Sequence, residues 1–170
     1  GFYSCALKEI GFKKIFSFEP NKEVYKIMKN NFSNNDLLNI VPLPYGIYNE
    51  TKEMELSYPS IADNNLIKTL DRYSTGSFSL KGSGNDPIRA KFKKFNDIKE
   101  IQNLKECNLV KIDVEGAEIE VIKELEPLIK ICHPVLIIEF NTNYLNKNNF
   151  NLIKKILFNN KYHNFFVFGN

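Results

Sequence analysis

Tryptophan is absent from the 170 residues, and histidine, methionine and cysteine are scarce, with two, two and three copies. Cys5, Cys107 and Cys132 are far apart in the sequence, and there is no CxxC pair and no HExxH motif. These absences exclude the usual zinc-binding spacings and a disulfide framework, so we expect no bound metal. No apolar run approaches the roughly 20 residues of a membrane span, and residues 1–10 do not resemble a signal peptide. We therefore expect a reducing, cytoplasmic setting without a membrane span.

An excess of charge of one sign is also missing. Lys and Arg total 23 against 20 Asp and Glu, and the two signs are interspersed. Proteins that bind nucleic acid usually gather basic residues on one face, so we expect no nucleic-acid partner. What the sequence does contain is apolar material, at 43% of its residues. That amount suits the core of one domain covering residues 1–170.

Short apolar runs alternate with helical patterns along the chain. This alternation is typical of an α/β fold in which helices flank a mostly parallel sheet. The predicted strands are residues 14–19, 38–43, 88–95, 109–114, 135–140 and 165–168. In the second of these, Pro42 disfavours a central position because it cannot donate to a neighbouring strand.

Helical patterns occupy the stretches between these strands. Asn21 is suited to cap the first helix. The apolar stripe of that helix has one polar interruption and consists of Val24, Ile27, Met28, Asn31 and Phe32. Further helices are expected over residues 117–125, from Pro127 to about 131, and over 150–158.

Residues 49–97 form the least regular segment, with glycine and proline among Ser, Asn and Asp. Long irregular insertions in compact domains are often functional, so we expect this segment to cover the site of an acceptor substrate. Within residues 74–86 we single out Gly76 and Ser79 as the first positions to test.

Three predicted strands end in carboxylates, namely at Glu19, at the pair Asp113 and Glu115, and at Glu139. Ligands of open α/β sheets gather beyond the carboxyl ends of the strands. One ionised carboxylate such as Glu19 can accept hydrogen bonds from both hydroxyls of a ribose. The alternative, that Glu19 simply faces solvent at a strand end, stays open.

The pair Asp113 and Glu115 precedes Gly116, which permits a tight turn into the next helix. Strand alternation predicts that both acids lie on one side, with Asp113 deeper and Glu115 facing the turn. Such a pair could accept a hydroxyl proton, bind a cation or hold a cationic cofactor. Alternatively, Glu115 and Glu118 are ordinary acids at a helix N-terminus, where the helix dipole favours them.

His133 and His163 precede strands, which is the wrong end for a site in an α/β sheet, so we expect structural or exposed roles for both. The basic residues Arg89, Lys91 and Lys93 are expected on a solvated face.

Several segments together resemble the FkbM-type methyltransferases. The most specific is Lys111–Glu118 (KIDVEGAE), followed by an apolar helix and the run His133–Glu139 (HPVLIIE). Phe18–Asn21 (FEPN) resembles the second strand and helix of that family, and residues 75–80 and 95–97 are weaker matches. The resemblance covers Gly1 to about Phe140.

The resemblance implies a Rossmann-like class I methyltransferase fold that uses S-adenosyl-L-methionine. The implied reaction is O-methylation of a sugar, a glycan or a secondary-metabolite hydroxyl. It also implies roles for individual residues. Asp113 and Glu115 would be catalytic, where the sulfonium and the acceptor hydroxyl meet, and the cofactor-binding residues would be Gly1, Tyr3, Glu19, Pro20, Asn21, Tyr45 and Gly46.

Gly1–Ser4 resembles only the tail of the family's glycine-rich motif, and the strand before it is not in this sequence. We therefore expect an N-terminally truncated domain whose parent continues upstream. The alternative function is a non-catalytic or degenerate nucleotide-binding module, since Glu19 would suit NAD equally. Lys111–Glu118 favours the methyltransferase, because a NAD domain has no need of that segment.

Overall fold

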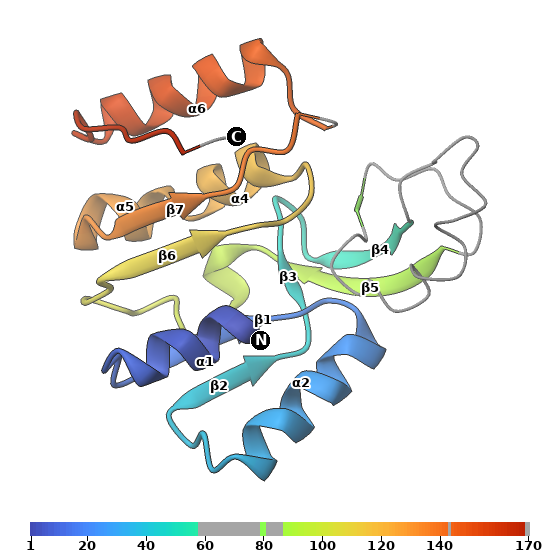
Figure 1. The fold of residues 1–170 in the computed structure, drawn as a ribbon. Helices are drawn as coiled ribbons and strands as arrows, with labels where there is room; N and C mark the ends of the chain where they lie inside the picture. The colour runs from blue at the N-terminus through green and yellow to red at the C-terminus, as the bar shows by residue number, and fades with distance from the viewer. Residues whose placement is uncertain (58–78, 81–86, 143, 169–170) are drawn as a thin grey trace. The chain divides into compact units, whose positions relative to one another are not determined.

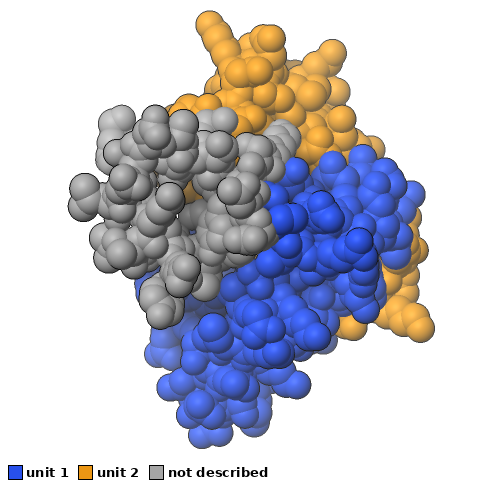
Figure 2. Space-filling model, turned by 90° about the vertical axis from the view of Figure 1, so that its right-hand side faces the viewer, with its two compact units in different colours: residues 1–94 blue, residues 95–170 orange. Residues whose placement is uncertain are grey.

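The computed structural model describes residues 1–57, 79–80, 87–142 and 144–168. The chain forms two compact units, residues 1–94 and residues 95–170, which Figure 2 colours separately. Each unit combines helices with short strands, so the chain is α/β as the sequence predicts (Figure 1). No helix within the described ranges is long and apolar enough to cross a membrane.

The first unit opens with α1 (Phe2–Glu9), β1 (Ile15–Phe18), α2 (Lys22–Asn34) and β2 (Ile40–Leu43). β1 and β2 are parallel, with Ile15 opposite Ile40 and Phe18 opposite Leu43. Pro42 is accommodated in β2, which pairs on one side only within the described chain. The core of this part consists of Ile15, Met28, Phe32, Leu37 and Ile40.

α2 begins where the sequence predicts, because the Asn21 side chain accepts hydrogen bonds from the backbone N–H groups of Glu23 and Val24. Its buried face differs from the predicted stripe. Met28 and Phe32 are buried, whereas the Ile27 side chain is 55% exposed. Ile27 is one residue from Met28 and so lies roughly 100° around the helix from the buried face.

The first unit ends in a small sheet with the order β3 (Gly46–Ile47), β5 (Ile88–Lys93), β4 (Lys52–Leu56). β5 confirms the strand expected at 88–95, and β4 is a strand that the sequence did not predict within the segment 49–97. Three of the five residues of β4 are charged, namely Lys52, Glu53 and Glu55. The alternation of apolar and polar residues that predicts a strand is therefore weak. Most of residues 74–86, including Gly76, lies outside the described chain. Ser79 is buried and pairs with Ser57 through two backbone hydrogen bonds.

The second unit contains η2 (Phe95–Asp97), β6 (Leu109–Ile112), α4 (Glu118–Glu124), α5 (Glu126–Cys132), β7 (Val135–Ile138) and α6 (Lys147–Asn159). β6 and β7 are parallel, with Ile112 opposite Ile138. α4 contacts both α5 and α6. The most deeply buried apolar side chains of the unit are Ile98, Ile112, Ile122, Ile129 and Leu145.

Two expectations for this unit have clear outcomes. Pro127 does begin a separate short helix, since it occupies the first turn of α5. The strand expected at 165–168 is wrong: these residues form no ladder, and the Phe168 side chain is 92% exposed. An apolar run without a neighbouring strand has no hydrogen-bond partners that would make it a strand.

Candidate active site

Two strand ends come together in the second unit. The Glu139 N–H donates a 2.9 Å hydrogen bond to the Ile112 carbonyl, which extends the β6–β7 ladder by one residue. Asp113 and Glu139 therefore leave the sheet side by side at its carboxyl end. This is the edge at which α/β sheets place their ligands.

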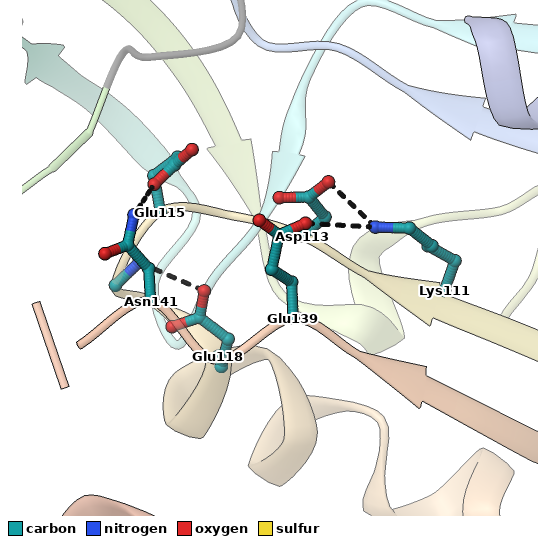
Figure 3. Close-up of polar contacts among 7 residues, drawn as sticks. Lys111, Asp113, Glu115, Glu118, Glu139 and Asn141 are labelled. Carbon is teal, nitrogen blue, oxygen red and sulfur yellow. Dashed lines mark hydrogen bonds and ion pairs between the residues drawn. The ribbon is translucent and has the colours of Figure 1, made fainter. Parts of the chain in front are cut away.

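A lysine lies beside these two acids and contacts both (Figure 3). Lys111 Nζ is 2.7 Å from Asp113 Oδ2 and 3.7 Å from Glu139 Oε2. The Lys111 side chain is only 14% exposed, whereas that of Asp113 is 35% exposed. The cation that neutralises this strand end is thus an ammonium supplied by β6. Within the described ranges, no group of three or more His, Cys, Asp and Glu could hold a metal ion.

Glu139 does not ionise like an isolated acid. The neighbouring Asp113, burial and the Glu115 charge raise the pKa of Glu139, whereas Lys111 lowers it. The physical cause is that a second negative charge beside the first costs free energy, which one nearby cation only partly offsets. Asp113 and Glu139 are called the carboxylate pair below.

Glu115 lies on the turn after β6 and faces Asn141, which follows β7 (Figure 3). Asn141 Nδ2 donates a 2.8 Å hydrogen bond to Glu115 Oε2. Burial raises the pKa of Glu115, the Asn141 hydrogen bond lowers it, and the charges of Asp113 and Glu118 raise it further. Asn141 thus favours the ionised form of Glu115, whereas burial and the two nearby acids favour the neutral form.

The argument from strand alternation does not hold for Asp113 and Glu115, and their predicted order of depth is wrong. β6 ends at Ile112, and Glu115 has a φ of 49°, so strand alternation does not govern where its side chain points. Glu115 is also the less exposed residue of the two, the reverse of the expected depth. Glu115 and Gly116 have consecutive positive φ values and form the turn before α4.

Glu118 holds this turn in place. Its side chain is 1% exposed, and Oε1 accepts a 3.1 Å hydrogen bond from the Gly116 backbone N–H. Glu118 is the first residue of α4, so its negative charge also faces the positive end of the helix dipole. The alternative interpretation from the sequence, an acid placed at a helix N-terminus, therefore holds for Glu118.

In the first unit, Glu19 follows β1 and is half-buried. Glu19 Oε1 accepts a 2.8 Å hydrogen bond from the Asn21 backbone N–H across Pro20. Burial raises the pKa of Glu19, while this hydrogen bond lowers it. A carboxylate can accept more hydrogen bonds than the one from the Asn21 N–H, so the group suits a diol such as a ribose.

The remaining predicted cofactor residues also lie in the first unit. Tyr45 is buried, with the Lys93 ammonium 4.1 Å from its ring centroid. A Cβ at Gly46 would lie 2.6 Å from the Phe92 ring, and one at Gly1 would lie 2.9 Å from Phe32. Packing against phenylalanine therefore accounts for both glycines. The fourth of these residues, Tyr3, has a side chain that is 54% exposed.

Both histidines lie away from the strand ends that carry acids. His133 ends α5 at the amino end of β7, and His163 packs edge-on against Phe158. Lys111 and Asn141 are the site residues that the sequence reading missed. The signal for both was position, since Lys111 is two residues before Asp113 and Asn141 two after Glu139.

The chain matches the family model of the methyltransferase FkbM domain over residues 2–165. It therefore belongs to the FkbM methyltransferase family, as Lys111–Glu118 indicates.

Two curated relatives are also methyltransferases. The chain is 26% identical to methyltransferase sdnD of Sordaria araneosa, over 66% of this chain and 51% of that protein. It is 26% identical to the hexuronic acid methyltransferase AglP of Haloferax volcanii, over 72% of this chain and 46% of that protein. The chain thus spans about half the length of each relative. No solved structure matches it.

Proposed function

We propose that this protein transfers a methyl group from S-adenosyl-L-methionine to a hydroxyl oxygen of a sugar or glycan. The observation that carries the proposal is the strand end of a methyltransferase-family domain at which Asp113 lies beside Glu139 and Lys111. The name of one relative, a hexuronic acid methyltransferase, supports a sugar acceptor. The parallel ladders β1–β2 and β6–β7 support a Rossmann-like class I domain.

Glu19, Pro20 and Asn21 are the residues that would hold the cofactor ribose. The fit rests on a half-buried carboxylate at the carboxyl end of a parallel strand, held in place by the Asn21 N–H. Tyr45 and Gly46 follow the neighbouring strand β2 and would lie near the adenine. When bound, S-adenosyl-L-methionine would supply an activated methyl group on a positively charged sulfur. The sulfur would keep the electron pair of its bond to the methyl carbon.

The protein's own residues orient the acceptor and remove its proton. The ionised Asp113 carboxylate is held by the Lys111 ammonium and accepts the hydroxyl proton. Glu115, fixed by Asn141, accepts a hydrogen bond from a second hydroxyl of the acceptor. Most of the rate enhancement then comes from positioning, because the donor needs no further activation.

The test is methyl transfer by the purified protein from S-adenosyl-L-methionine with a tritiated methyl group. The acceptors are glucuronic acid, a glucuronic-acid-terminated oligosaccharide and the matching neutral glucose oligosaccharide. We expect label in the sugar fraction, with the uronic acid preferred. A cooperatively folded protein that binds S-adenosylhomocysteine in calorimetry but labels no acceptor would instead be the nucleotide-binding module.

A further inference from the structure

The acid at the end of β7 has no role in the chemistry described so far. We propose that Glu139 acts together with Asp113 in proton removal, so that the two carboxylates take up the hydroxyl proton as one unit. This inference rests on the proposed methyl transfer. It adds Glu139 and Lys111 to the residues that control the reaction.

The geometry of the two strands brings the acids together. The 2.9 Å bond from Glu139 N–H to the Ile112 carbonyl fixes the backbone of Glu139 beside the residue that follows Ile112. The side chains of Asp113 and Glu139 lie beside each other at this strand end (Figure 3). Lys111 contacts both, at 2.7 Å from Asp113 and 3.7 Å from Glu139 (Figure 3).

Two ionised carboxylates in contact bind a first proton more tightly than either acid alone, because that proton removes their repulsion. The groups that act on Glu139 are Asp113 and Glu115, which raise its pKa, and Lys111, which lowers it. Together with burial, the acids outweigh the lysine, since the pKa of Glu139 is raised overall. A base with a raised pKa accepts a proton more readily near neutral pH.

The chemical step is a proton transfer that balances within the site. The acceptor O–H bond breaks and its electron pair stays on the oxygen, which forms the new bond to the methyl carbon. The proton binds to Asp113 and is shared with Glu139. The pair then carries one negative charge instead of two, beside the positive charge of Lys111. The shared proton later passes to solvent, which restores the ionised pair.

The first experiment is a carbon-13 NMR titration of the side-chain carboxyls in the whole protein, which needs no substrate. In the wild type we expect Glu139 to titrate above the ordinary range of a glutamate. Asp113→Asn removes the like charge and lowers the Glu139 midpoint, whereas Lys111→Met raises it. An unchanged Glu139 midpoint in Asp113→Asn would show that the two acids are independent and overturn the proposal.

The second experiment measures kcat against pH for methyl transfer to glucuronic acid. Activity is lost on the acid side when the pair is already protonated. Glu139→Gln should therefore move the acid limb to lower pH and reduce the plateau kcat by about 10-fold or more, because a weaker base remains. Glu139→Asp keeps a carboxylate and should retain the wild-type limb.

The matched control is Glu106→Gln, an exposed acid before the amino end of β6, which should leave the profile unchanged. An active enzyme whose acid limb is the same in Glu139→Gln and wild type overturns the role of Glu139. A folded wild type that labels no sugar overturns the proposed function instead, and the NMR titration then decides whether the pair itself exists.

Discussion

Asn141 Nδ2 donates a 2.8 Å hydrogen bond to Glu115 Oε2, joining the residue that turns away from β6 to the one that follows β7. The bond lowers the pKa of Glu115 against the burial that raises it. Asn141 therefore controls the charge of Glu115 as well as its position.

We expect Asn141→Leu to raise the pKa of Glu115, because it removes the stabilising donor and leaves burial unopposed. Less Glu115 is then ionised at a given pH, so the acceptor KM should increase most on the acid side. The measurements are a carboxyl NMR titration and KM for glucuronic acid across pH. Asn148→Ala, an exposed change in the first turn of α6, is the control. A Glu115 midpoint that does not rise in Asn141→Leu would contradict this role.

Glu19 should contribute to cofactor binding only in its ionised form. Glu19→Ala removes an acceptor of charge-assisted hydrogen bonds, and we expect a loss of about 1–3 kcal/mol in affinity for S-adenosylhomocysteine. Because burial raises the pKa of Glu19, wild-type affinity should decrease as the pH falls through that raised pKa. The decrease then begins at a higher pH than for an ordinary glutamate.

Calorimetry across pH checks both effects. The matched control is Glu23→Gln, whose side chain is 74% exposed on α2. If Glu19→Ala binds S-adenosylhomocysteine as tightly as the wild type does, Glu19 is not in the cofactor site.

Local sequence patterns were enough to locate most elements and the acids at their ends. β1, the Asn21 cap of α2 and the paired strands β6 and β7 follow from runs of apolar residues and capping chemistry. The acids that end β1, β6 and β7 were visible for the same reason, because the end of each run marks the carboxyl end of a strand.

What the sequence left out depends on contacts between distant residues. The direction of Glu115 follows from its φ of 49°, which no pattern of neighbouring residues reveals. Lys111 is largely buried beside two acids. One of them, Glu139, is 28 positions further along the chain, directly after β7. Residues 165–168 have the composition of a strand, but a strand also needs a neighbour, and composition does not report one.

Glu118 should stabilise the turn before α4. Glu118→Ala leaves the buried Gly116 N–H without this acceptor, and we expect a loss of about 1–3 kcal/mol in the free energy of unfolding. Glu118→Gln keeps an oxygen acceptor and should lose less. Urea unfolding measures the difference, with Lys123→Ala on the exposed side of α4 as the control. Equal stability of Glu118→Ala and wild type would show that the turn does not depend on this bond.

The last prediction separates the roles of Asp113 and Glu115. Asp113→Asn keeps the shape of the side chain but removes its charge, so kcat should fall by about 10²–10⁴ if Asp113 accepts the proton. Glu115→Gln keeps a hydrogen-bonding oxygen and should act mainly on the acceptor KM. The two variants therefore differ in which kinetic constant changes.

A purely structural role predicts another result. If both acids only stabilised the start of α4, each variant would lose about 0.5–2 kcal/mol of stability while the folded protein kept normal kinetics. Asp113 contacts Lys111 of β6, which lies outside α4. Melting temperature and single-turnover rate, measured on the same preparation of each variant, distinguish the two. Lowered stability with a normal rate in both variants would exclude Asp113 as the proton acceptor, whereas a slow, normally stable Asp113→Asn would support it.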